Sequence, residues 1–149
     1  MGKKVLFSQI QTLLHQQHFG VLATQGSVYP YCSLVGFIAT EDGQEIFFAT
    51  MRDTHKYANL KKNPQVSLLI DSQTNKENDF KNAKALTVLG SVQEINNTSE
   101  AAVYFPLYIK RHPHLERFIT DPDCAWIKII VFKYILVNNF QDVLEYSVK

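Results

Sequence analysis

Hydroxyl and cationic side chains alternate in a short segment near the middle of the chain, at Thr50, Arg52, Thr54 and Lys56. The segment lies where a strand-forming run over residues 45–50 gives way to a predicted short helix. Backbone N–H groups at the start of a helix have no partner within the helix and favour an anion, and hydroxyls and cations add charge-assisted hydrogen bonds. The spacing therefore predicts a phosphate-binding site at this junction.

The alternative to a phosphate site at this junction is an ordinary solvated helix start with Asp53 as its N-cap. The rest of the sequence offers few other chemical motifs. The glycine-rich loops GxxxxGK[ST] and GxGxxG, which hold nucleotide phosphates, are absent. The five histidines show no metal-ligand spacing, and no residue stands out as a catalytic acid or base. Cys32 and Cys124 lie far apart without a CxxC motif, so neither a disulfide framework nor a thiolate zinc site is expected.

The overall composition predicts a single globular domain over residues 1–149. Hydrophobic residues make up 46% and charged residues 19% of the chain, a balance that permits a core. The formal net charge is +1, so no global field would draw the protein to nucleic acid or to an anionic membrane. No apolar run approaches the roughly 18–20 residues of a membrane span, and the N-terminal residues lack the apolar stretch of a signal peptide, so we expect neither. We expect a cytoplasmic protein.

Strand patterns dominate the chain, and most strands follow one another without an intervening helix. The pattern predicts strands over residues 19–24, 30–39, 45–50, 65–70, 84–96, 125–136 and 143–148. It predicts helices over residues 8–17, 54–62 and 101–111, with a polar loop over 71–82. The first helix begins with Ser8 and Gln11 as a capping box, and Gly90 indicates a bulge or bend. The arrangement favours a mainly β fold, an antiparallel barrel with helical decoration, over a parallel α/β sheet.

The sequence also predicts which side chains of two strands are buried. Trp126, Phe132 and Tyr134 lie at even positions of one strand, which predicts a buried face of the barrel. Cys32 is expected to be a small buried apolar residue, since nothing near it in sequence would activate the thiol for redox chemistry.

The segment over residues 46–69 has the order Thr-x-Arg-x-Thr-x-Lys-x-x-Asn-Leu-x-x-Asn-Pro-x-Val-Ser-Leu after its strand. It follows the strand Pro-Tyr-Cys-Ser-Leu at 30–34 and precedes Leu-x-Val-x-Gly at 86–90. In this order the chain resembles the pyridoxamine phosphate oxidase-like family of FMN-binding split barrels over roughly residues 8–147. The segment over 111–118, with Val137-x-x-Phe140, resembles a subgroup related to haem-utilisation proteins.

The resemblance implies an antiparallel Greek-key split β-barrel of the FMN-binding type, forming a homodimer with FMN at the subunit interface. At the matching positions, the residues that would hold the FMN phosphate are Thr50, Arg52, Thr54 and Lys56. The residues that would lie along the isoalloxazine ring are Tyr31, Cys32, Ser33 and Leu34. His55 occupies a position where some members carry arginine, and at neutral pH it is a weaker cation.

The C-terminal segment over residues 141–149 departs from authentic pyridoxamine phosphate oxidases, because it lacks the Arg and His that grip the substrate phosphate. We therefore expect a flavin-dependent oxidoreductase with another small-molecule redox substrate. An F420-dependent reductase is one alternative. A haem-handling or sensory binding protein is a second, with His112 or His114 as the ligand, although these two residues are otherwise expected to be surface residues that close the preceding helix.

Overall fold

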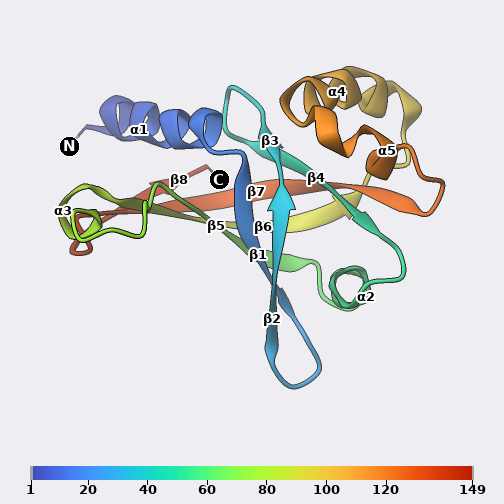
Figure 1. Cartoon of the computed structure of the whole chain (residues 1–149), viewed down its shortest axis with the longest axis horizontal. Helices are drawn as coiled ribbons and strands as arrows, with labels where there is room; N and C mark the ends of the chain where they lie inside the picture. The colour runs from blue at the N-terminus through green and yellow to red at the C-terminus, as the bar shows by residue number, and fades with distance from the viewer. Residues whose placement is uncertain (1, 149) are drawn as a thin grey trace.

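One antiparallel sheet of eight strands forms the body of the protein, in the computed structural model that describes residues 2–148. Its strand order is β2-β1-β5-β6-β7-β4-β3, and β8 pairs with β7 beside this path. The strands are β1 (Phe19–Gln25), β2 (Pro30–Gly36), β3 (Ile38–Ala39), β4 (Glu45–Met51), β5 (Gln65–Asp71), β6 (Lys84–Glu94), β7 (Cys124–Asn138) and β8 (Asp142–Ser147). The curled sheet in Figure 1 is a split barrel, which confirms the predicted fold class.

Within the described residues, five helices and one 3-10 turn decorate the sheet; Figure 1 shows how they are arranged around it. They are α1 (Lys3–Gln16), α2 (His55–Lys62), α3 (Asp79–Asn82), α4 (Thr98–Arg111), η1 (Pro113–Leu115) and α5 (Glu116–Ile119). The first helix begins before the predicted position, with Gly2 as its N-cap, so the capping box at Ser8 is wrong. The reason is that Leu6 continues the apolar face of α1 by a further turn and is itself buried.

The sheet is forced to curl because its two edges are almost contiguous in sequence. Strands β2 and β3 stand at opposite ends of the strand order, yet only Phe37 separates them along the chain. Two residues at the end of α4 fix this crossing. The Tyr108 hydroxyl donates to the Gly36 carbonyl at 2.9 Å, and His112 Nε2 lies 2.8 Å from the Phe37 carbonyl oxygen. The predicted continuous strand over 30–39 is therefore broken where the chain changes edge.

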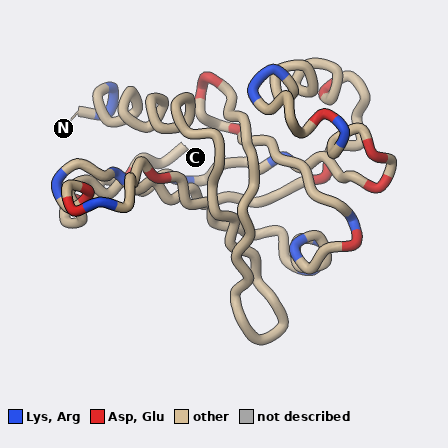
Figure 2. The backbone as a smooth tube through the Cα atoms, viewed as in Figure 1, with Lys and Arg blue, Asp and Glu red and all other residues tan. Residues whose placement is uncertain are grey.

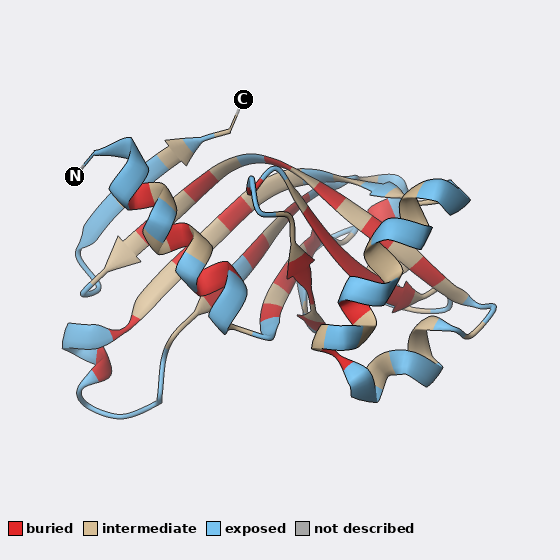
Figure 3. Cartoon of the chain, turned by 90° about the horizontal axis from the view of Figure 1, so that it is seen from above, coloured by how far each residue is buried: buried red, intermediate tan, exposed pale blue. Residues whose placement is uncertain are grey.

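The main core fills the concave side of the sheet beneath α1 (Figure 3). Leu22, Phe48, Leu68 and Leu86 are among its completely buried members. A second, smaller cluster lies beneath α4 and joins buried Phe47 and Tyr108 to the partly buried Trp126. The two clusters lie on opposite faces of the same strands, since neighbouring residues of a strand point to opposite sides.

A bulge divides β7 into two halves with opposite alternation. Leu89 pairs with Lys133 and Gly90 with Val131, so Phe132 has no partner on β6. Odd-numbered residues are buried before the bulge and even-numbered residues after it, as at Tyr134. The irregularity predicted at Gly90 is confirmed as a register shift between Leu89 and Gly90, although the extra residue, Phe132, lies on the partner strand β7. The predicted common buried face is wrong for Phe132, which is 53% exposed, and for Trp126, which packs against the second cluster beneath α4.

None of the helices within residues 2–148 has the length and apolar character needed to cross a membrane.

Replacing Gly90 with alanine should destabilise the fold. A Cβ at this position would lie 2.5 Å from the Ile130 carbonyl oxygen and 2.7 Å from Ile129 Cγ2, and the first of these belongs to the backbone of a paired strand. Overpacking of this kind costs about 1–3 kcal/mol. Urea unfolding at fixed protein concentration should show the loss. Gly2→Ala is the control, because a Cβ there would meet nothing within 4 Å. Equal midpoints for the two variants would contradict the prediction.

Candidate functional site

The end of β4 and the start of α2 bring two threonine hydroxyls together. Thr50 is completely buried, and its Oγ1 lies 3.2 Å from Oγ1 of Thr54. Thr54 is the N-cap of α2, because its Oγ1 accepts from the Tyr57 N–H at 3.1 Å while its own proton goes to the Met51 carbonyl at 2.9 Å. The helix predicted over residues 54–62 is thus confirmed, and Thr54 rather than Asp53 caps it.

Lys56 lies in the first turn of α2 and is partly buried. Within residues 2–148 its ammonium makes no hydrogen bond and no ion pair, and burial lowers its pKa. The backbone N–H groups of His55 and Lys56 likewise have no hydrogen-bond acceptor within residues 2–148. A partly buried ammonium and two free backbone N–H groups therefore lie together at the start of α2. Such a group of hydrogen-bond donors is suited to binding an anion.

Arg52, between the two threonines in sequence, is already engaged within the protein. Its guanidinium donates to Glu94 Oε2 at 2.8 Å, to the Pro122 carbonyl at 3.1 Å and to the Cys124 carbonyl at 3.3 Å. The hydrogen bond with Glu94 is the main reason that the pKa of Arg52 is raised. The structure therefore places Arg52 at the junction, but with partners of its own.

The strand β2 presents its residues to two different faces. Tyr31 and Ser33 share the face that is buried further along at Val35, whereas Cys32 and Leu34 lie on the opposite face. Cys32 is exposed, so its predicted burial is wrong. The cause is that β2 is an edge strand, paired only with β1 among the described strands, and that its outer side is left exposed at Cys32 and Leu34.

Tyr31 is the member of this strand that the fold brings to the junction. Its ring centroid lies 5.8 Å from that of His55 at the start of α2. A hydrogen bond of 3.0 Å from the Asn59 amide to Thr24 Oγ1 holds α2 against the β1–β2 hairpin. On the same inner face, the Ser33 hydroxyl is buried without a hydrogen-bond partner among the described residues. The phosphate-site residues and one face of β2 thus adjoin.

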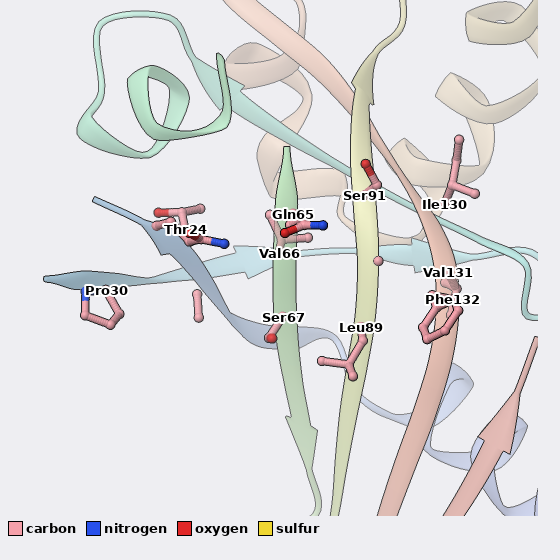
Figure 4. A pocket seen from close by; sticks show the side chains of 13 residues that line it. Thr24, Pro30, Gln65, Val66, Ser67, Leu89, Ser91, Ile130, Val131 and Phe132 are labelled. Carbon is pink, nitrogen blue, oxygen red and sulfur yellow. The ribbon is translucent and has the colours of Figure 1, made fainter. Parts of the chain in front are cut away.

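A groove of about 650 Å³ crosses the outer face of the sheet, over β1, β5, β6 and β7 (Figure 4). Its lining includes Ala23, Ser67, Leu89 and the bulge residue Phe132. The first three lie side by side in register, and Cys32 continues the same row on β2. The sequence did not predict this groove, because it arises from pairing between distant strands.

The two candidate haem ligands differ in exposure. His112 is 5% exposed, so its predicted surface position is wrong, whereas His114 is exposed. Because a carbonyl oxygen only accepts, the contact with Phe37 requires the proton of His112 to be on Nε2, which leaves no lone pair there for a metal. Burial is the main reason that the pKa of His112 is lowered. Among residues 2–148 no group of three His, Cys, Asp or Glu side chains is placed to hold a metal ion.

The family of the chain follows from comparison with known sequences. The family described as pyridoxamine 5'-phosphate oxidase matches residues 6–137, nearly the whole chain. The chain belongs to this family. None of the curated proteins is significantly similar to it in sequence.

Solved structures share the fold at low sequence identity. A haem-binding protein from Mycobacterium smegmatis is 16% identical, with a TM-score of 0.80 over 92% of this chain and 55% of its own. A FAD-binding protein from Mesorhizobium loti is 15% identical, with a TM-score of 0.70 over 87% of this chain and 91% of its own. General stress protein 26 from Bacillus anthracis is 20% identical, with a TM-score of 0.69 over 96% and 98%. The chain therefore spans little more than half of the mycobacterial protein, and these likenesses establish the fold alone.

Removing the cap of α2 should loosen the junction. Thr54→Ala deletes the oxygen that accepts from the Tyr57 N–H, which costs about 0.5–2 kcal/mol. Thr54→Ser keeps the hydroxyl and should retain most of the stability. Chemical unfolding of both variants measures the difference. If the serine variant lost as much stability as the alanine variant, the methyl group rather than the cap would be responsible.

Proposed function

We propose that this protein binds FMN between two copies of the chain and acts as a flavin-dependent oxidoreductase on a small-molecule redox substrate. The observation that carries the proposal is Lys56, a partly buried cation at the start of a helix that has no counterion among the described residues. Membership of the pyridoxamine 5'-phosphate oxidase family supports a flavin as the ligand.

The junction has the donors that a terminal phosphate requires. Lys56 supplies charge, the N–H groups of His55 and Lys56 supply hydrogen bonds, and Thr54 lies beside them as the N-cap. A phosphate bound here would remove the cost of holding Lys56 charged in a partly dehydrated position, so ligand and site would stabilise each other.

The flavin ring would lie against the inner face of β2. Tyr31 offers an aromatic surface beside the junction, and the Ser33 hydroxyl is a buried polar group that still lacks a partner. The unpaired edge of β2 adds backbone N–H and carbonyl groups for the polar edge of a ring system. On this arrangement Cys32 and Leu34 would meet the ligand only through their backbone or from the partner subunit.

When bound, the flavin supplies the electron-transfer chemistry. The chain contributes binding and orientation: Lys56 and Thr54 fix the phosphate end, and Tyr31 and Ser33 fix the plane of the ring. We assign no side chain as a catalytic acid or base. Deazaflavin F420 also carries a phosphate and would use the same junction, so the choice between the two rings depends on β2 and on the second subunit.

The second subunit would cover the outer face of the sheet. Residues 19–40 contain no Asp, Glu, Lys or Arg, and the β1–β2 hairpin is uncharged throughout in Figure 2. Its exposed apolar side chains include Tyr29 at 80% and Leu34 at 68%. Edge strands that stay free in solution usually carry charges or proline to prevent pairing, and large exposed apolar patches mark interfaces. A second copy of the chain that packs on this face and its groove would bury both the uncharged edge strand and the exposed apolar side chains.

Lys56→Ala should weaken FMN binding by about 1.5–3 kcal/mol, the scale of a charge-assisted hydrogen bond. Riboflavin, which lacks the phosphate, should bind almost unchanged. Quenching of flavin fluorescence on titration measures both affinities. Lys62→Ala is the matched control, because it removes the same charge from the exposed end of the same helix.

Equal losses for FMN and riboflavin would place the phosphate elsewhere. If the wild-type protein bound neither flavin, the proposal would fail. Competition by F420, or a Soret shift on titration with haemin without any flavin binding, would favour the corresponding alternative.

Phe132→Glu should convert a dimer into a monomer, because the exposed bulge side chain lines the groove that the second copy would cover. Sedimentation equilibrium measures the association state. Val103→Glu on α4 is the control, since Val103 is also exposed, at 59%, but lies on a helix outside the groove. An unchanged dimer in the Phe132 variant would exclude this face as the interface.

A further inference from the structure

Arg52 joins three segments that are distant in sequence. Its side chain bonds to Glu94 at the end of β6 and to the carbonyls of Pro122 and Cys124 at the start of β7. Its backbone N–H donates to the Asp123 carbonyl at 3.0 Å. The residue therefore closes the end of the β4–β7 ladder just before the chain turns into α2.

Glu94 is shared between Arg52 and α2. One carboxylate oxygen accepts from Arg52 at 2.8 Å, and the other accepts from the Tyr57 hydroxyl at 2.5 Å. The Glu94 side chain is only 16% exposed. Although burial alone would raise its pKa, the hydrogen bonds from Tyr57 and Arg52 hold the pKa of Glu94 below its usual value. The carboxylate is thus charged, and the pair carries no net charge.

This geometry gives Arg52 and Lys56, the two cations of the junction, different roles. We propose that Arg52 is a clamp held by Glu94, which fixes the start of α2, and that of these two cations Lys56 is the one that binds the phosphate. The proposal rests on the proposed function and narrows it, because it removes Arg52 from the expected phosphate ligands.

The energetic cost of using Arg52 as a phosphate ligand supports this assignment. A guanidinium binds a phosphate best with two parallel N–H groups, and Arg52 already uses both of its terminal nitrogens on protein acceptors. Turning it toward a phosphate would leave Glu94 charged, largely buried and without its cation. The Arg52 side chain is 41% exposed, so the cost is that of a lost charge-assisted hydrogen bond rather than that of a fully buried charge. Lys56 would give up no contact of this kind on binding the same phosphate.

The first arm of the test uses the protein without flavin. Arg52→Ala, Arg52→Lys, Glu94→Gln and the double variant Arg52→Ala/Glu94→Gln are compared by urea unfolding. A clamp needs the planar fork, so lysine should not rescue stability, and Glu94→Gln should lower the unfolding midpoint much less once Arg52 is gone. A lysine variant as stable as wild type, or fully additive effects of the two substitutions, would overturn the clamp.

The second arm measures the ratio of the riboflavin and FMN dissociation constants, which reports phosphate binding independently of any general loosening of the site. Arg52→Ala should leave this ratio within about twofold of wild type, whereas Lys56→Ala should lower it at least about tenfold. A collapse of the ratio in Arg52→Ala that Arg52→Lys restores would make Arg52 a phosphate ligand and overturn the proposal.

The two arms also separate this proposal from the proposed function. If the protein bound no flavin, the unfolding cycle would still decide whether Arg52 and Glu94 form a clamp. Inorganic phosphate would then replace FMN as the probe, and it should raise the unfolding midpoint of wild type and of Arg52→Ala but not of Lys56→Ala. Protection that is lost in Arg52→Ala would overturn the assignment of the anion to Lys56.

Discussion

The crossing from β2 to β3 at Phe37 is the constraint on which the barrel depends. Two edge strands joined by one residue force the whole sheet to curl, and the carbonyls exposed at the crossing need buried donors. Tyr108 and His112 supply them from the end of α4. Burial raises the pKa of Tyr108 and lowers that of His112, so that one remains a neutral phenol and the other a neutral imidazole with its proton toward the carbonyl. Fold closure thus uses His112, one of the two histidines that the sequence offers as a haem ligand.

The curled sheet leaves its two faces with unequal tasks. Its concave face is closed by α1 and the main core, whereas the outer face over β1, β2 and β5 keeps a groove and an uncharged edge. Since β2 alternates between these faces, one strand can contribute Tyr31 and Ser33 to a site inside while it offers Cys32 and Leu34 to a surface outside. If the proposed flavin site and dimer are correct, ligand binding and dimer formation would be coupled through β2 alone, without a conformational change.

Local signals predicted the features that depend on neighbours in sequence. The strands, the helix α2 and the bulge at Gly90 follow from periodicity, from the Asn-Pro stop and from a glycine within a strand. The failures required long-range information. The bulge inverted the alternation around Phe132, and an acceptor 75 residues away buried His112. The partner of Arg52 could not be predicted either, because Glu94 lies 42 residues further along the chain and reaches it only through strand pairing.

Because the same fold occurs in haem-binding and FAD-binding proteins at 16% and 15% identity, the architecture does not select the ligand. The selection has to lie in individual side chains. A haem site needs an imidazole nitrogen that is free to bind iron. His112 has committed its Nε2 to the backbone, so the Nδ1 of this buried ring and the exposed imidazole of His114 are what this segment still offers to a metal. A phosphate site needs a positive charge that the protein has not neutralised. Among residues 2–148, Glu94 neutralises Arg52 and no carboxylate pairs with Lys56, and this difference is the basis on which we propose a ligand that ends in a phosphate.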